Sequence, residues 1–172
     1  MRRQTVLRQI PKIDKVEYLI SPNIGEELKP LSKIASGGEL SRVMLALKGI
    51  LAKGDKIPVL IFDEIDAGIG GRAAETVGQK LKSLSASHQV ICITHLPQIA
   101  SYADTHLKIE KKIKAKRTTV EVRKIEKDER TVEIARMLSG DSSEVSIKHA
   151  KEMLKLKGRG GEDSRDQVKI IN

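Results

Sequence analysis

Hydrophobic residues along this chain fall into two spacings, which predict an alternation of helices and strands. Over 39–53, and again over 72–86, apolar residues recur at the three- and four-residue spacing of one helical face. The short runs at 58–62 and 90–94 are apolar without a break, which is typical of strands buried on both faces of a parallel sheet. Strand, helix and strand in this order predict a parallel crossover connection.

Weaker patterns surround this unit. They predict a strand over 14–20, a short helix over 97–103, a hairpin with strands at 105–110 and 118–125, and helices over 129–138 and 143–157. From Gly158 onward the chain has glycines and charges but little periodicity. We therefore expect one lobe over 1–157 and a disordered tail over 158–172.

The charge of the chain is unevenly distributed. Lysine and arginine number 32 against 23 acidic residues, a net charge of +9, to which 1–15 contribute +4 and 108–130 contribute +5. Two basic segments beside a balanced core suit a polyanion such as DNA, although a solvated, heat-adapted surface explains them equally well. With only two tyrosines and one phenylalanine, contacts to DNA would be made mostly to phosphates rather than by base stacking.

Cysteine and hydropathy bear on the compartment. Cys92 is the one cysteine and lies in an apolar run, so we expect a core residue and no disulfide within the chain. No apolar segment is long enough for a membrane span, and no signal peptide is recognisable. Together with the basic segments that suit DNA, these features predict a cytoplasmic, nucleoid-associated protein without a membrane partner.

A glycine-rich turn comes directly before the first amphipathic helix. Ser36 stands where an N-cap belongs, and Gly37 and Gly38 occupy the first helical turn. The N–H groups of such a turn have no partner inside the helix and can approach a phosphate closely. Ser36 and Glu39 also match a capping box, which is common in proteins without any such ligand.

Polar residues follow both buried strands. Asp63 and Glu64 follow the first, and Thr94 and His95 end the second. Parallel sheets bind ligands beyond the carboxyl ends of their strands. There an aspartate can hold Mg²⁺, a neighbouring glutamate can polarise an attacking water, and a histidine can contact a terminal phosphate. Taken one by one, adjacent acids at a strand end are often only solvated, and a lone histidine is more often structural.

Together these segments resemble the motifs of ABC-type ATPases. Residues 36–39 resemble the signature motif, 59–64 the Walker B strand, 65–68 the D-loop, and His95 the switch histidine. Glu39 in place of glutamine, and isoleucine rather than proline after the Asp-Glu pair, point to the SMC-like DNA repair branch. The strings over 31–42 and 63–71 closely resemble the RecN family of bacterial repair proteins, and the likeness covers roughly residues 14–155.

The resemblance implies a fold and a set of roles. The fold would be the carboxy-terminal half of a three-layer P-loop ATPase head, with parallel strands, a small hairpin and terminal helices. ATP would lie between two heads, with Asp63 on Mg²⁺ through water and with Glu64 and His95 as catalytic residues. The signature residues Ser36, Gly37, Gly38 and Glu39 would contact ATP held by the opposite head. Asp66, Ala67 and Gly68 would form the D-loop, with Asp66 at the seam between the two sites.

One motif of the family is missing. The phosphate-binding loop Gly-x-x-x-x-Gly-Lys-Ser/Thr is absent, since no Gly-Lys pair occurs in the chain. The resemblance therefore implies partners: an amino-terminal half with the Walker A loop and coiled coil, a second head, and DNA. It implies that the chain alone is an inactive part of an ATPase.

Other functions stay open at this stage. The chain could be a non-catalytic module that binds DNA through 108–130 or docks a partner head. An ABC transporter subunit is disfavoured by Ile65. A metal-dependent nuclease of the topoisomerase-primase type needs Asp-x-Asp, whereas Asp63 and Asp66 are three residues apart.

Overall fold

The structure is a computed structural model, and it describes residues 16–21, 25, 27–33, 36–51, 56–114, 117–157 and 168–172. The chain forms two compact units, Met1–Ala35 and Ser36–Asn172. The second unit carries all the residues singled out above as candidate site residues. No helix in the described ranges has the length and apolar character that crossing a bilayer requires.

The first unit contains a small antiparallel pair. Strand β1 (Leu19–Ile20) pairs with β2 (Lys29–Pro30), and the 3₁₀ turn η1 (Leu31–Lys33) follows. The N–H of Leu31 donates to the carbonyl of Tyr18 at 2.7 Å. The strand predicted over 14–20 is therefore much shorter among the described residues, and residues 14 and 15 lie outside them.

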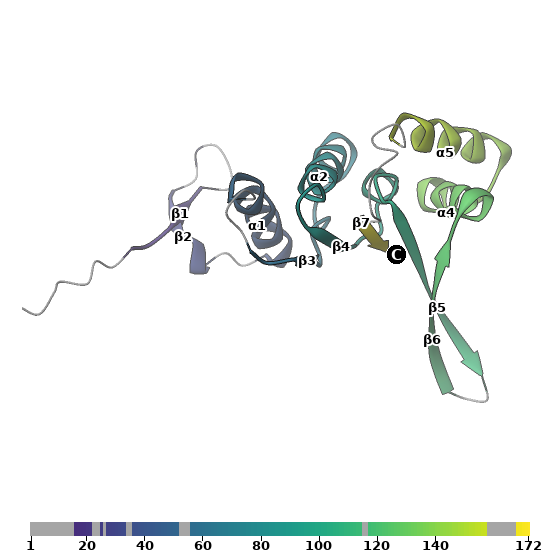
Figure 1. The fold of residues 1–172 in the computed structure, drawn as a ribbon, viewed down its shortest axis with the longest axis horizontal. Helices are drawn as coiled ribbons and strands as arrows, with labels where there is room; N and C mark the ends of the chain where they lie inside the picture. Colours follow the sequence, from purple (N-terminus) through teal and green to yellow (C-terminus); the bar gives the residue numbers. More distant parts are fainter. Residues whose placement is uncertain are drawn as a thin grey trace, which may run out of the picture. The chain divides into compact units, whose positions relative to one another are not determined.

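The second unit is built on a five-stranded sheet with the order β3-β4-β7-β5-β6 (Figure 1). Its elements in chain order are α1 (Gly37–Leu51), β3 (Val59–Phe62), α2 (Gly71–Leu84), β4 (Gln89–Ile93), α3 (Pro97–Ala100), β5 (Thr105–Lys114), β6 (Arg117–Ile125), α4 (Lys127–Ser139), α5 (Glu144–Lys157) and β7 (Val168–Ile171). The pairs β3–β4, β4–β7 and β7–β5 are parallel, and only β5–β6 is antiparallel. The predicted α/β fold with parallel strands, a hairpin and terminal helices is confirmed.

The helices lie along one face of this sheet (Figure 1). Side chains that point toward the helices are buried, among them Leu60, Phe62, Val90, Val168 and Ile170. Cys92 is also fully buried on this face, as predicted for a core cysteine. The covered face and the inner sides of the helices together form the hydrophobic core of the unit.

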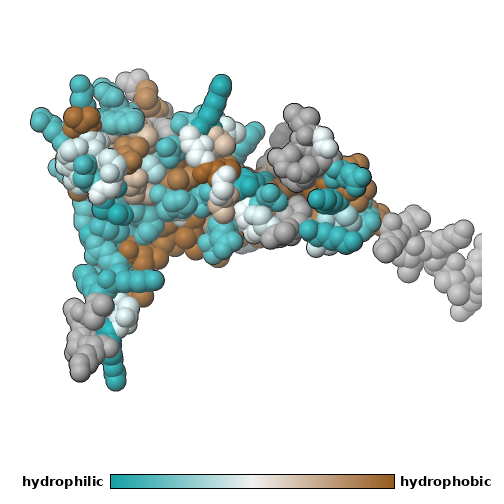
Figure 2. Space-filling model, turned by 180° about the vertical axis from the view of Figure 1, so that it is seen from behind, coloured by the Kyte–Doolittle hydropathy of each residue, from teal (hydrophilic) through white to brown (hydrophobic). Residues whose placement is uncertain are grey.

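The other face of the sheet is apolar but carries no helix among the described residues. Strand register places Ile61, Ile91 and Lys169 in one row, and Ile93, Ile171 and Leu107 in the next. Several side chains on this face are well exposed, and they are Val59, Ile61, Ile93, Ile109, Val120 and Val122. In Figure 2 a hydrophobic band follows the sheet beside the β5–β6 hairpin. The described part of the chain thus supplies two of the three layers that the resemblance implies.

Strand β7 corrects the prediction of a disordered tail for 168–171. Val168 and Ile170 are fully buried in the middle of the sheet, between β4 and β5. A short apolar run after a long polar stretch carries little periodic signal, but the gap between β4 and β5 offers it hydrogen bonds on both sides. Residues 158–167 lie outside the described ranges.

The hairpin is longer than predicted. Both strands extend into the basic segment 111–117, which lies between the two predicted strands. The ladder runs from His106 opposite Ile125 to Lys114 opposite Arg117. Residues 115 and 116 at its tip lie outside the described ranges. After the hairpin, α4 ends at Gly140, which adopts the left-handed conformation that favours glycine at a helix end (φ 81°).

Candidate active site at the strand ends

The glycine turn forms the first turn of α1. The Ser36 Oγ accepts a long hydrogen bond from the N–H of Glu39, at 3.5 Å, which is a weak version of the predicted cap. Gly37 is exposed, whereas Gly38 is buried. A Cβ on Gly38 would lie 2.8 Å from the Ala67 Cβ and 2.8 Å from the carbonyl oxygen of Glu64. Glycine is therefore required here by close packing within the chain, in addition to any ligand.

The turn after β3 places the two acidic residues at the carboxyl edge of the sheet. Asp63 and Glu64 are both exposed, and an Asp63 oxygen accepts the N–H of Glu64 at 2.8 Å. Glu64 has a φ of 55°, an unfavourable conformation for a residue with a side chain. Its side chain faces the helix turn, since a Cβ built on Gly37 would lie 2.5 Å from the Glu64 Oε2. The predicted catalytic glutamate and signature glycine are thus neighbours in one chain.

Helix α1 holds this turn from one side. The Ser41 hydroxyl donates to the carbonyl of Asp63 at 2.8 Å. The Arg42 guanidinium donates to the carbonyls of Ile65 and Ala67, at 3.2 and 2.9 Å. The Ile65 side chain is fully buried beneath the turn. Ser41 and Arg42 therefore hold the backbone of the turn that carries the acidic residues.

Strand β4 holds the turn from the other side through Asp66. This residue is buried, with only 5% of its surface exposed. Its Oδ2 accepts from the Thr94 hydroxyl at 2.5 Å, from the His95 N–H at 2.9 Å, and lies 2.9 Å from the His95 Nδ1. Asp66 is therefore directed into its own chain, toward β4. The predicted D-loop and switch histidine meet directly.

The donors at this edge are compatible with Mg²⁺ in the manner expected for a nucleotide site. No cluster of three or more potential metal ligands occurs in the described residues. Asp63 is a single exposed carboxylate, of which one oxygen is engaged by a backbone N–H. Mg²⁺ typically keeps several waters and takes one or two carboxylates together with substrate phosphates, which matches one carboxylate better than a closed protein cage.

The buried thiol of Cys92 lies near the acidic residues of this edge, and its pKa responds to their charges. Burial, with smaller contributions from the charges of Asp66 and Asp63, raises the pKa of its thiol to about 12. The thiol therefore stays protonated and inert at neutral pH. It belongs to the core rather than to the chemistry of the edge.

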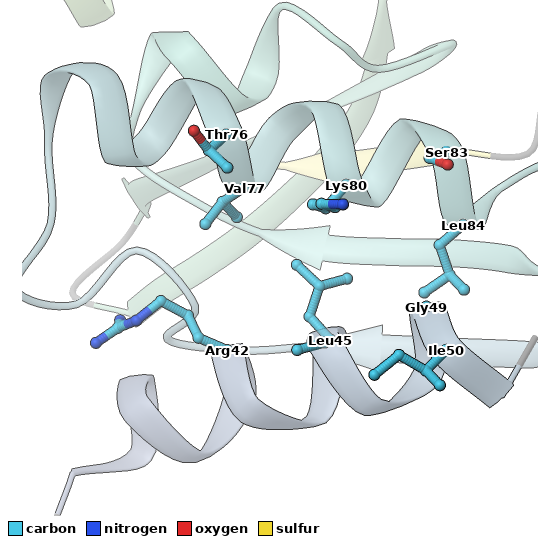
Figure 3. Close-up of a pocket in the computed structure, with 10 residues that line it drawn as sticks. Arg42, Leu45, Gly49, Ile50, Thr76, Val77, Lys80, Ser83 and Leu84 are labelled. Carbon is cyan, nitrogen blue, oxygen red and sulfur yellow. The ribbon is translucent and has the colours of Figure 1, made fainter. Parts of the chain in front are cut away.

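A groove between α1 and α2 has a volume of about 470 Å³ (Figure 3). It is lined by Arg42, Leu45, Ala46, Gly49, Ile50, Thr76, Val77, Lys80, Ser83 and Leu84. Half of these residues have apolar side chains, and the carboxylates at the strand ends are not among them. The groove is therefore separate from the acidic residues of the candidate site.

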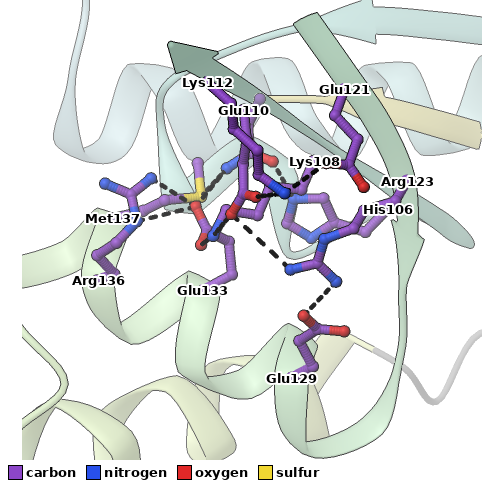
Figure 4. Close-up of polar contacts among 11 residues, drawn as sticks. His106, Lys108, Glu110, Lys112, Glu121, Arg123, Glu129, Glu133, Arg136 and Met137 are labelled. Carbon is purple, nitrogen blue, oxygen red and sulfur yellow. Dashed lines mark hydrogen bonds and ion pairs between the residues drawn. The ribbon is translucent and has the colours of Figure 1, made fainter. Parts of the chain in front are cut away.

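The basic hairpin carries an ordered set of ion pairs on one face (Figure 4). Lys108 lies 2.9 Å from both Glu110 and Glu133, and Arg123 pairs with Glu129. Lys112 pairs with Glu121 across the strands. Many of the positive charges that suggested a DNA-binding patch are thus matched by carboxylates, whereas Lys111 and Arg117 near the tip are exposed.

Sequence reasoning missed some residues of this site. Ser41 and Arg42 were part of the recognised string, but nothing in their spacing showed that they hold the turn after β3. Thr94 was recognised only as polar, and its hydrogen bond to Asp66 depends on two segments 28 positions apart. Roles of this kind arise from contacts between segments that only the folded chain brings together.

Comparison with known proteins gives a consistent result. The chain is 51% identical to the DNA repair protein RecN of Bacillus subtilis over 144 residues, which is 83% of this chain and 25% of that protein. It is 50% identical to RecN of Treponema pallidum over 147 residues, and 54% identical to RecN of Deinococcus radiodurans over 134 residues, covering 85% and 78% of this chain and 26% and 23% of those proteins.

Other comparisons add less. No protein-family model matches the chain. A solved chain described under "Structural biochemistry of ATP-driven dimerization and DNA stimulated activation of SMC ATPases" overlaps with a TM-score of 0.41 at 25% identity, covering 59% of this chain and 60% of that chain, which is too loose to argue from. The chain spans about a quarter of the length of the curated relatives it matches. The resemblance inferred from the motifs is confirmed: this chain is related to the carboxy-terminal part of the RecN DNA repair proteins.

Proposed function

We propose that this chain forms the carboxy-terminal part of a RecN-type ATPase head that acts in DNA double-strand-break repair. The observation that carries the proposal is the meeting of three segments at one sheet edge. The turn after β3 packs against the glycine turn of α1, and Asp66 in the same turn contacts His95 after β4. Segments that resemble signature, Walker B, D-loop and switch motifs thus lie side by side at one edge of the sheet, which supports the proposal.

In the proposed reaction each group has a distinct task. Glu64 accepts a proton from the attacking water, and the exposed ring of His95 contacts the γ-phosphate. Asp63 would hold Mg²⁺ through water, and the ion would supply neutralisation of phosphate charge when bound. Ser36 and the N–H groups around Gly38 contact the nucleotide of a second head, so ATP joins the two heads and hydrolysis releases them.

The open sheet face supports a role as part of a larger head. Strands of parallel sheets are normally covered on both faces, but here one face exposes Ile61, Ile93 and their neighbours. The relatives are about four times as long as the matched region. We infer that the amino-terminal part, with the phosphate-binding loop, covers this face and completes the head.

The test is reconstitution. The chain alone should hydrolyse ATP negligibly, and mixing it with the amino-terminal part of a RecN relative should restore turnover. Glu64→Gln should then remove turnover and trap an ATP-bound dimer, visible by size-exclusion chromatography. Glu152→Gln, at an exposed position of α5, is the matched control and should hydrolyse ATP normally. Normal turnover in Glu64→Gln would refute the assigned role.

Binding of DNA without catalysis is the competing function, and the hairpin is the feature that favours it. It projects from the sheet and exposes Lys111 and Arg117 near its tip (Figure 1). A non-catalytic module would bind DNA equally well without nucleotide, and the added amino-terminal part would restore no hydrolysis. The ion pairs of Lys108, Lys112 and Arg123 engage part of the hairpin's positive charge within the chain, which favours a DNA contact secondary to the ATPase.

A further inference from the structure

Asp66 and His95 form a contact that the resemblance does not assign. The motif reading places Asp66 at a seam between two heads. The structure buries its carboxylate, leaving 6% of the side chain exposed, while 75% of the His95 side chain is exposed. A buried carboxylate against an exposed imidazole is the arrangement by which proteins orient a histidine that faces a ligand.

The contact with Asp66 determines which ring nitrogen of His95 carries the hydrogen atom. An ionised carboxylate only accepts hydrogen bonds, so the His95 Nδ1, 2.9 Å from the Asp66 Oδ2, must be the donor. The neutral ring is then the Nδ1–H tautomer, and Nε2 carries the lone pair. Because the ring is exposed apart from this contact, Nε2 is left on the side away from Asp66.

The surrounding contacts make this orientation specific. The same Asp66 oxygen accepts the His95 backbone N–H and the Thr94 hydroxyl, so backbone and ring of His95 are fixed to one atom. The N–H of Leu96 donates to the Thr94 hydroxyl at 3.1 Å, which continues the chain of hydrogen bonds. On the other side, Arg42 binds the carbonyls that flank Asp66. Residues after β4 therefore hold the Asp66 carboxylate, and α1 holds the backbone on either side of it.

We propose that Asp66 is a positioning residue that fixes the tautomer and ring orientation of His95 within one chain. Its effect on the reaction rests on the proposed function, because it matters only if His95 contacts a phosphate. Its effect on the His95 ring does not depend on the proposed function and can be measured on the chain alone. The claim about the tautomer and the claim about hydrolysis can therefore be refuted separately.

The first experiment is long-range ¹⁵N–¹H correlation spectroscopy on the full chain labelled at histidine. The His95 signal is assigned by its loss in His95→Gln. The expected wild-type spectrum shows a protonated Nδ1 and an unprotonated Nε2 in the neutral ring. Asp66→Ala removes the acceptor and should shift the ring toward Nε2–H, the usual tautomer of free histidine.

Thr94→Val is the matched control. It removes another hydrogen bond to the same oxygen and perturbs the same loop, but leaves the contact between Asp66 and the His95 ring in place. It should keep the Nδ1–H tautomer. An Nε2–H ring in the wild-type chain would overturn the proposal, and this outcome does not depend on whether Asp66→Ala folds.

The second experiment uses the reconstituted head. Asp66→Ala should lower kcat by about 10- to 100-fold, as loss of a residue that orients a functional histidine typically does, with KM for ATP changed by less than about threefold. An unchanged kcat together with an altered tautomer would refute the positioning role. Glu64→Gln should abolish turnover without changing the ring. If no variant or wild type hydrolyses ATP, the proposed function fails, while the spectra still decide the tautomer.

Discussion

Both faces of strands β3, β4 and β7 carry apolar residues, but the two faces differ in what covers them among the described residues. On the helix side, Val90, Val168 and Ile170 are fully buried. On the opposite side, Ile61 is 67% exposed, although the residues next to it in sequence, Leu60 and Phe62, are core residues. Unbroken apolar strands are built for burial on both faces. Among the described residues only one of these faces is covered, and the proposed docking of the amino-terminal part would cover the other.

The sharpest test of this comparison places the same charge on each face. Ile170→Asp puts a carboxylate without a partner into the covered core and should cost more than about 4 kcal/mol, enough to unfold a domain of ordinary stability. Ile61→Asp on the open face should change the free energy of unfolding by less than about 1 kcal/mol. Urea denaturation followed by circular dichroism measures both.

The Ile61→Asp variant also tests whether the amino-terminal part covers the open face of the sheet. Ile61→Asp should fold normally but fail to recover ATP hydrolysis with the amino-terminal part, because the docking surface has gained a charge. Equal destabilisation by the two substitutions would mean that the open face is already covered within this chain.

A smaller loss of stability is expected from substitutions in the first turn of α1, which packs against the turn after β3. Gly38→Ala should destabilise by up to about 3 kcal/mol, because the new methyl group meets the backbone of Glu64 and the side chain of Ala67. Gly37→Ala meets only the end of the Glu64 side chain, which can move. Thermal unfolding should therefore show a larger destabilisation for Gly38→Ala than for Gly37→Ala. Equal destabilisation by the two substitutions would contradict the packing described for Gly38.

The next prediction concerns the pH dependence of stability. Glu133 is a buried residue of α4. Burial favours the neutral acid, but hydrogen bonds from Arg136 and Lys108 outweigh it and lower the pKa of Glu133 to about 2. Its ionised form therefore stabilises the fold above about pH 4.5 and loses this contribution as pH falls toward 2. Glu133→Gln should cost about 1.5 kcal/mol near pH 7.

The pH profile makes this prediction specific. The difference in unfolding free energy between wild type and Glu133→Gln should shrink between pH 5 and 3, as the wild-type carboxylate gains a proton in the unfolded chain. Glu152→Gln, in an exposed position on α5, is the control and should show no such change. A constant difference across this range would show that charge is not what Glu133 contributes.

The smallest expected effect concerns the end of β7. The Asn172 side chain forms hydrogen bonds with His106 at 2.7 Å and with Glu133 at 2.8 Å, which connect the end of β7 to the hairpin and to α4. Asn172→Ala should weaken the fold by about 1 kcal/mol. Cys92 lies opposite Ile170 in the register, so its thiol should react about fivefold faster with a disulfide reagent once β7 opens more often.

The control for this measurement is Thr118→Ala on the exposed part of β6, which should leave the labelling rate of Cys92 unchanged. Identical rates in wild type and Asn172→Ala would show that β7 does not open separately from the rest of the sheet.

The sequence by itself determined the local elements and the candidate chemistry. The helical spacing over 39–53 and 72–86, and the apolar runs at 58–62 and 90–94, predicted α1, α2, β3 and β4 to within a few residues. These signals are local, because each reflects which side of one element is buried. The motif strings over 31–42 and 63–71 were distinctive enough to indicate the RecN family, which the relatives confirm.

Only the tertiary structure decided where β7 lies, that the described residues leave one sheet face open, and that Asp66 faces His95. Each of these depends on segments far apart in the chain. Val168–Ile171 is too short to carry a periodic signal and becomes a strand because β4 and β5 leave backbone groups to pair on both sides. In the same way, a motif names Asp66 and His95, but only the parallel pairing of β3 with β4 brings carboxylate and imidazole within hydrogen-bonding distance.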